Sequence, residues 1–155
     1  MRIFKFLLLS LVAVALFSCE PTYVKEYSWA YPISGDWKVN AYIDGVEVGG
    51  PYEIKVYNSS FGQDSIWIDD YATTSSNGHF WSMKFKAAAD MSTKTFQTTG
   101  SKNAINGYGI VISVANGKVI NTDSITMDLV FSDDPTTTYQ LAGHRMVGYD
   151  DYMGH

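Results

Sequence analysis

The 155-residue sequence contains a single cysteine, Cys19, and fewer basic than acidic residues, 11 against 16. A lone cysteine excludes an internal disulfide, so a packed core has to stabilise the fold. The net charge of −5 argues against nucleic acid as a partner, because phosphates require clustered lysine and arginine. For the same reason we do not expect the folded part to adhere to anionic lipid by charge.

Motifs that carry catalysis or metal binding are missing as well. The sequence has no G-x-S-x-G, no H-x-x-x-H, no cysteine cluster, no calcium-loop spacing and no glycine-rich phosphate loop. We expect His79 to begin a strand as a solvated rim residue, and His144 to point outward. Asp69 and Asp70 are sequence neighbours, so on a strand they face opposite sides and do not form the facing carboxylates of a glycosidase. The residues therefore predict no metal, no cofactor and no catalytic site.

One long apolar run is present, and it stands at the start. Residues 6–17 are apolar apart from Ser10, and the run follows Arg2 and Lys5. It is too short to span a bilayer as a helix but has the length of a signal-peptide core. We predict that residues 1–18 are a signal peptide, and their removal would lower the net charge to −7, because Arg2 and Lys5 go with them.

The run ends in "LFSCE", residues 16–20, which resembles the bacterial lipobox. The resemblance implies that Cys19 becomes the lipidated N-terminus and anchors the protein in a membrane. Aspartate directly after the lipidated cysteine resembles a signal for retention in the inner membrane. This chain has Glu20 at that position, so we expect an outer-membrane lipoprotein of the cell envelope. The alternative is an ordinary secretory signal with an incidental cysteine.

The rest of the chain alternates apolar and polar residues with a period of two, which is typical of half-buried strands. We expect a tether at 19–34, one β-domain at 35–149 and a short tail at 150–155. Predicted strands lie at 37–43, 52–57, 65–71, 81–87, 94–99, 109–115, 118–121, 124–132 and 138–148. Asn116-Gly117 is a strong hairpin signal, and residues 86–93 could form one helical turn. Eight or nine short antiparallel strands predict an all-β meander, and closing it into an up-and-down barrel would remove the exposed edges.

The first predicted strand opens with "GDW", residues 35–37. Gly-x-Trp at this place resembles the signature of the lipocalin-like, or calycin, barrels. The resemblance implies that Trp37 closes the floor of the barrel and that a basic residue late in the last strand, here Arg145, lies across it. The geometry agrees, because the first and last strands of an even-numbered barrel are antiparallel neighbours. In a β-sandwich, Trp37 would be an ordinary core residue.

The alternation places an uncharged set of side chains inside such a barrel. Its candidate ligand-lining members are Val39, Ile54, Val56, Ile68, Trp81, Met83, Phe85, Ile112, Met127, Leu129, Phe131 and Tyr139. An apolar cup with a polar rim suits a lipid or a fatty acid. Large residues such as Trp81, Phe85 and Phe131 could equally fill an eight-stranded barrel. The interior is therefore expected either to hold one small hydrophobic ligand or to be a packed core.

The chain from residue 19 to 150 also resembles a group of lipoproteins from Bacteroidetes-type bacteria, the lipid-binding putative hydrolases. The lipobox, the aromatic tether, "GDW" and the closing "LVFSDDPTTTYQLAGHRMVGYD" carry the likeness. It implies a membrane-anchored protein that binds a hydrophobic molecule, with hydrolysis as an alternative. A further alternative is a surface module for glycans or proteins using Tyr42, Tyr57, Trp67, Tyr71 and Phe80. The last alternative is that the protein is an inhibitor or a structural partner of another protein. The sequence does not indicate the oligomeric state.

Overall fold

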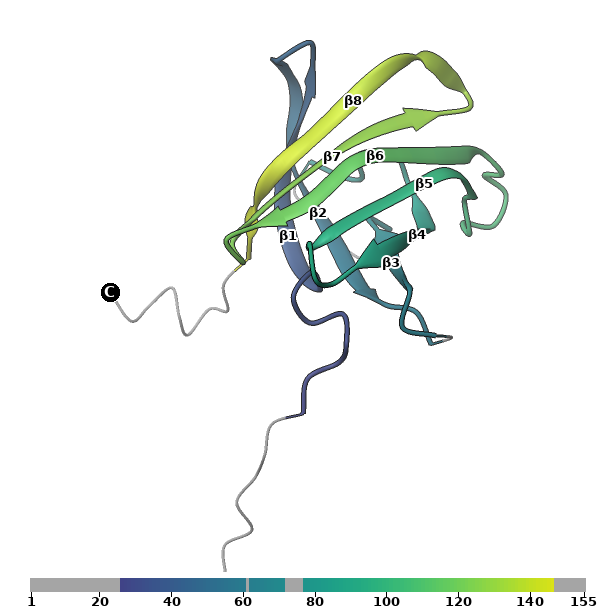
Figure 1. Ribbon diagram of the computed structural model, residues 1–155. Coiled ribbons are helices and arrows are strands. Elements are labelled where there is room, and N and C mark those ends of the chain that lie inside the picture. Colours follow the sequence, from purple (N-terminus) through teal and green to yellow (C-terminus); the bar gives the residue numbers. More distant parts are fainter. Residues whose placement is uncertain (1–25, 61, 72–76, 147–155) are drawn as a thin grey trace, which may run out of the picture.

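The computed structural model describes residues 26–60, 62–71 and 77–146. Within them the chain forms eight antiparallel strands, each paired with the next until the last returns to the first (Figure 1). The strands are β1 (Gly35–Ile43), β2 (Val46–Asn58), β3 (Ser65–Asp69), β4 (Lys84–Asp90), β5 (Thr95–Lys102), β6 (Val111–Ile120), β7 (Ser124–Phe131) and β8 (Asp134–Arg145). The predicted all-β, up-and-down barrel is confirmed. In the described part of the chain, no helix is long and apolar enough to cross a membrane.

The alternation in the sequence sets which side chains face the barrel interior. Along β7 every second residue is buried, beginning with Ile125 and ending with Phe131, because successive side chains of a strand point to opposite faces. The register of β8 on β1 pairs Trp37 with Arg145 and Ala41 with Leu141. These pairs close the cylinder and leave neither terminal strand with a free edge.

The barrel has two distinct ends. β1 starts and β8 finishes at one end, which we call the base, whereas the β3–β4, β5–β6 and β7–β8 connections lie at the other, the mouth (Figure 1). Residues 29–33 form a turn at the base, in which Ser34 N donates to Ala30 O at 2.8 Å. Ala30 and Ile33 are fully buried. Part of the predicted tether therefore packs under the barrel and covers its base.

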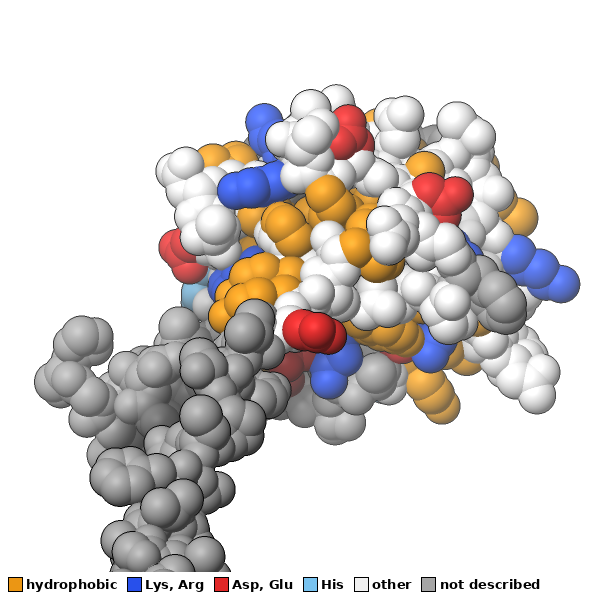
Figure 2. Space-filling model, turned by 60° about the horizontal axis from the view of Figure 1, so that its bottom comes forward, with side chains coloured by type: hydrophobic (Ala, Val, Ile, Leu, Met, Phe, Trp, Pro, Cys, Tyr) orange, Lys and Arg blue, Asp and Glu red, His pale blue; other side chains and the backbone are white. Residues whose placement is uncertain are grey.

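The surface at the base carries hydrophobic side chains beside charged ones (Figure 2). Tyr27 and Tyr31 are both about half exposed, and their ring centroids lie 4.0 Å apart. Ile120, at the end of β6, and Met146, directly after β8, are exposed as well. The base, where β1 begins, therefore exposes hydrophobic as well as polar side chains.

The hairpin predicted at Asn116-Gly117 is wrong. β6 runs through both residues, and the register with β7 shifts between Ala115 and Lys118, so that the pair forms a bulge. Asn116 has a φ of 53°, a left-handed conformation that bulges and hairpins both use. Asn-Gly supplied that conformation without reversing the chain, because Lys118 continues to pair with the neighbouring strands.

Two other local predictions are also corrected. Residues 86–93 contain no helical turn: β4 continues to Asp90, and a turn leads into β5. The strand predicted to begin near His79 and Trp81 starts only at Lys84. His79 and Trp81 instead belong to the irregular connection between β3 and β4, which crosses the mouth.

Candidate functional site

At the base, Arg145 lies over Trp37. The guanidinium carbon is 4.2 Å from the centroid of the indole ring, a cation–π geometry that contributes about 0.5–2 kcal/mol. Arg145 Nε donates to Thr122 O at 2.8 Å, and Nη1 donates to Ser34 O. Burial lowers the pKa of Arg145, whereas nearby Tyr31 and Asp123 act in the opposite direction. The arginine thus ties the first strand, the last strand and the β6–β7 turn together.

The same contact explains the glycine of the Gly-x-Trp motif. A Cβ built on Gly35 would overlap the guanidinium of Arg145. Gly35 also has a φ of 153°, which side chains other than hydrogen rarely allow. The glycine is therefore needed for the close approach of Arg145, and base closure depends on three residues, Gly35, Trp37 and Arg145.

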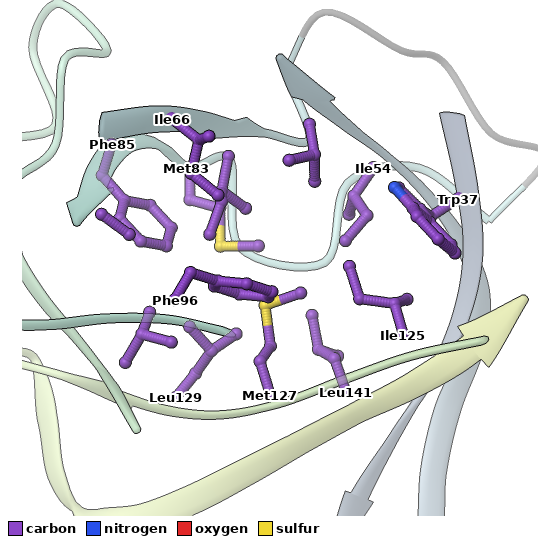
Figure 3. Close-up of a cluster of buried hydrophobic side chains, with 14 of the residues drawn as sticks. Trp37, Ile54, Ile66, Met83, Phe85, Phe96, Ile125, Met127, Leu129 and Leu141 are labelled. Atoms are coloured by element: carbon purple, nitrogen blue, oxygen red, sulfur yellow. The ribbon is translucent and has the colours of Figure 1, made fainter. Parts of the chain in front are cut away.

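The interior of the barrel is packed with side chains. Ten of the twelve predicted ligand-lining residues are at most 1 % exposed: Val39, Ile54, Val56, Ile68, Met83, Phe85, Ile112, Met127, Leu129 and Phe131. All ten belong to one buried cluster, and Ile54, Met83, Phe85, Met127 and Leu129 point toward one another in the centre of the barrel (Figure 3). Because these side chains expose almost no surface, no space is left beside them for a ligand in this conformation. Of the two alternatives that the sequence allowed, a ligand cavity or a packed core, the structure contains the packed core.

The two remaining candidates, Trp81 and Tyr139, are only half buried and lie at the mouth. Trp81 stacks on Phe131 with ring centroids 4.3 Å apart and planes 7° apart. Phe80 contacts Tyr52, Phe131 and Tyr139 at centroid distances of 5.4, 6.0 and 5.6 Å. We call these five rings, Tyr52, Phe80, Trp81, Phe131 and Tyr139, the aromatic mouth. They form the partly exposed roof of the core.

The buried carboxylate of Asp70 holds the segment that carries two of these rings. Its oxygens accept hydrogen bonds from Trp81 N at 2.9 Å and Met83 N at 2.5 Å, and the side chain is fully buried. Burial raises the pKa of Asp70, although the backbone donors counteract it. Between the two donors, Ser82 adopts a φ of 48°. Asp70 thus holds the backbone of this segment, while the side chains of Phe80 and Trp81 pack against other rings and Trp81 Nε1 lies 3.4 Å from Asp133 Oδ1.

Acidic and phenolic groups surround the aromatic mouth. Tyr108 OH donates to Asp133 Oδ2 at 2.6 Å, and Trp81 Nε1 lies 3.4 Å from Asp133 Oδ1. Tyr139 OH donates to Asp134 Oδ2 at 2.8 Å. Hydrogen bonding to the neighbouring carboxylates raises the pKa of both tyrosines. The mouth therefore combines apolar rings with a negatively charged rim.

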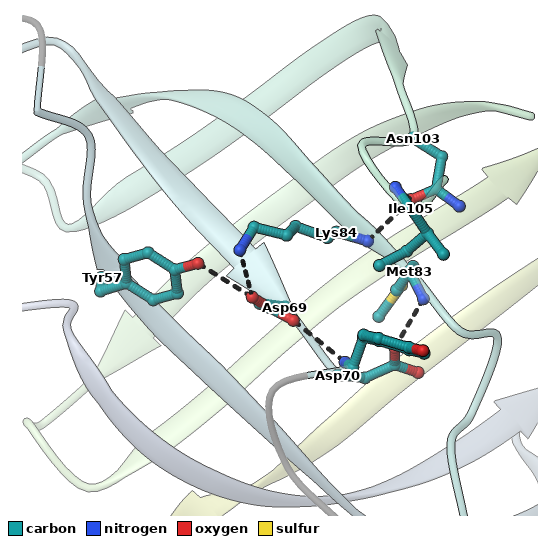
Figure 4. A network of polar contacts seen from close by, with 8 residues as sticks. Tyr57, Asp69, Asp70, Met83, Lys84, Asn103 and Ile105 are labelled. Atoms are coloured by element: carbon teal, nitrogen blue, oxygen red, sulfur yellow. Dashed lines mark hydrogen bonds and ion pairs between the residues drawn. The ribbon is translucent and has the colours of Figure 1, made fainter. Parts of the chain in front are cut away.

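A second polar cluster lies on the outer wall, where β3 ends and β4 begins. Asp69 Oδ2 accepts from Tyr57 OH at 2.8 Å and pairs with Lys84 Nζ at 3.0 Å (Figure 4). Lys84 and Lys86 lie 5.5 and 4.9 Å from the centroid of the Trp67 ring. Of the aromatics predicted for a glycan-binding surface, Tyr57 and Trp67 are half buried in this network, whereas Tyr71 is exposed. The two rings join β2, β3 and β4 rather than form an open platform.

His79 lies at the mouth, and His144 lies on the outer face of β8. His79 Nδ1 donates to Asp70 O at 2.6 Å, and the ring stacks on Tyr71. His144 lies on the exposed face of β8, opposite Ser124 and Lys38 in the adjacent strands. In residues 26–60, 62–71 and 77–146 no group of three or more His, Cys, Asp or Glu side chains could hold a metal ion. Cys19 and the tail fall outside the described residues.

Sequence reasoning missed the role of the paired acids. Asp69 and Asp70 are both buried: Asp69 contacts Tyr57 and Lys84, whereas Asp70 accepts hydrogen bonds from backbone N–H groups of the β3–β4 connection. Asp133 and Asp134 accept hydrogen bonds from Tyr108 and Tyr139 at the mouth.

Comparison with known families gives one match. Residues 22–150 match the model of a family described as "Lipid-binding putative hydrolase". The match covers the whole barrel and most of the chain. No curated protein matches the sequence.

Proposed function

The chain belongs to the family of lipid-binding putative hydrolases, and from this premise we propose that it binds a lipid at the aromatic mouth of its barrel. The observation that carries the proposal is the pair Phe80 and Trp81. These rings cover the apolar core and keep part of their surface in solvent. Their segment belongs to no strand, so the rings can turn aside without breaking the barrel.

Binding has to displace ring contacts, because the core is filled. Losing the stack of Trp81 on Phe131 costs about 0.5–1.5 kcal/mol. Withdrawing half of one aromatic side chain from the core adds about 2–3 kcal/mol at 25 cal/mol per Å². Each methylene of an acyl chain that takes this place returns about 0.8 kcal/mol. About five buried methylenes therefore offset the opening, and each further one increases affinity about fourfold.

A chain-length series with a fluorescence readout tests the proposal. Monoacylglycerols of increasing chain length are titrated into protein lacking residues 1–19, and native mass spectrometry counts the bound molecules. We expect affinity to rise with each methylene and then to level off, and we expect tryptophan emission to change. Trp81→Phe should abolish most of that change, whereas Trp67→Phe on the outer wall, the matched control, should preserve it.

Two outcomes would overturn the proposal. If no lipid of any chain length binds, the protein is not a lipid-binding module of this kind. If lipid binds and Trp81→Phe retains the full emission change, the lipid is bound elsewhere than at the mouth.

We further propose that Cys19 carries lipid and that the protein is anchored in the outer membrane. "LFSCE" and the preceding apolar run support this. The described chain begins at Glu26, seven residues after Cys19, a span of about 25 Å at most. Such an anchor would hold the base, with exposed Tyr27 and Tyr31, near the bilayer and turn the mouth away from it.

The anchor has its own test. Cells expressing the full chain are fed a clickable fatty acid, and the label should attach to the native chain but not to Cys19→Ala. The labelled protein should sediment with outer membranes. Label retained by Cys19→Ala would refute lipidation at this residue, and sedimentation with inner membranes would refute the location.

A further inference from the structure

Among the described residues, the rim of the aromatic mouth carries two acidic side chains. Asp133 and Asp134 start the β7–β8 turn and β8, and they contact Trp81 and Tyr139, two members of the aromatic mouth. Asp133 is exposed and Asp134 is half buried. A third acid, Asp70, lies directly beneath the Phe80–Trp81 segment. A head group that follows an acyl chain into this site would come to rest among carboxylates.

Phenol and hydroxyl groups contact Asp133 and Asp134. Their hydrogen-bond donors are neutral: the hydroxyl of Tyr108 for Asp133, and the hydroxyls of Tyr139 and Thr137 for Asp134. In the described part of the chain the ion pairs join Lys55 to Asp36 and Lys84 to Asp69, both on the outer wall. His79 faces Asp70 from the same connection. Among the described residues, no lysine or arginine forms an ion pair with Asp133 or Asp134.

We propose that the mouth selects lipids whose head group bears hydrogen-bond donors and no negative charge, such as monoacylglycerols or long-chain amines, and disfavours fatty-acid anions. This inference rests on the proposed lipid site. Each carboxylate oxygen has more acceptor capacity than its present donors use, so a hydroxyl or ammonium head group finds partners. A fatty-acid carboxylate finds only like charge, which is repulsive and is screened by salt.

Competition between lipids of equal chain length tests the selection. A fatty acid, its monoacylglycerol and the matching alkylamine compete for the native protein at low salt. We expect the fatty acid to bind about tenfold more weakly than either competitor, the size of effect that one nearby like charge produces. Raising the salt concentration should narrow the gap, because the rim is partly exposed.

Variants locate the effect. The double substitution Asp133→Asn and Asp134→Asn should bring fatty-acid affinity to that of the monoacylglycerol. Asp128→Asn, which alters a carboxylate bonded to Asn116 and Gln140 on the outer wall, should leave the gap unchanged. The salt dependence of the native protein provides the same information if the double variant does not fold.

The outcomes separate the two proposals. If the fatty acid binds the native protein as tightly as the monoacylglycerol, the selection is refuted while lipid binding stands. If the gap exists but persists in the double variant and at high salt, the rim acids do not cause it and the inference fails. If none of the three lipids binds, the proposed function itself fails.

Discussion

Gly35→Ala and Arg145→Met should destabilise the barrel by the same physical route. Arg145→Met removes the cation–π contact with Trp37 and two hydrogen bonds, to Ser34 O and Thr122 O. We expect the free energy of unfolding to fall by about 3 kcal/mol, because the stem still packs while the charged contacts are lost.

In Gly35→Ala the new methyl group would occupy the position of the guanidinium. Arg145 has to swing out, so the variant loses the same contacts. The backbone at a φ of 153° adds about 1 kcal/mol of strain. The single variant should thus cost about 4 kcal/mol, and the double variant should also cost about 4 kcal/mol, where two independent losses would give about 7 kcal/mol.

Urea unfolding of protein without residues 1–19 measures these differences. With a slope of about 2 kcal/mol per molar, Arg145→Met should lower the midpoint by about 1.5 M. Gly45→Ala is the matched control, because Gly45 also has a positive φ but no atom within 4 Å of its built Cβ. In the double variant of Gly45→Ala and Arg145→Met, the two losses of unfolding free energy should add in full. Additive losses for Gly35→Ala and Arg145→Met would refute the claim that the glycine serves the arginine.

Three further predictions concern the core, the bulge and the mouth. Leu129→Ala should lower the unfolding free energy by about 2–5 kcal/mol in urea, because a filled core cannot collapse around the gap; a loss below 1 kcal/mol would indicate spare space inside. Gly117→Ala should cost about 1–3 kcal/mol, since its Cβ would overlap Phe96, and an unchanged midpoint would contradict that packing. Because burial raises the pKa of Asp70, the folded chain holds this proton more tightly than the unfolded chain, so stability relative to Asp70→Asn should fall as pH rises from about 4 toward neutrality. A constant or rising difference across that range would show that the carboxylate is not penalised by burial.

The fold could be predicted because its main determinant is local. A period of two marks each strand and sets the inward face, and antiparallel order then brings Trp37 beside Arg145 without further information. Local sequence signals gave a wrong prediction where one backbone conformation occurs in two kinds of structure, a hairpin turn and a β-bulge. Asn116-Gly117 favours a left-handed residue, and only the pairing of Lys118 on both sides shows that the chain continues.

The site could be predicted only in part. The alternating pattern identified the apolar residues that face inward, but it does not determine whether their side chains fill the barrel completely. Whether Phe85, Met127 and their neighbours leave a cavity depends on rotamers across eight strands, and the structure shows that they do not. The hold of Asp70 on the Phe80–Trp81 segment was also invisible, since that segment was taken for part of a strand and its backbone donors were assigned to a ladder.

The union of β1 with β8 has a consequence for how the chain is made. Arg145 meets Ser34 across 111 positions of sequence, so the earliest strand to leave the ribosome waits for the latest. Throughout that interval β1 offers an unsatisfied row of amides and carbonyls to any passing strand. A nascent chain that lacks β8 would be an open sheet with an exposed edge, which is prone to aggregate. We therefore expect chaperones that bind unfolded nascent chains to matter more for this protein than its size suggests.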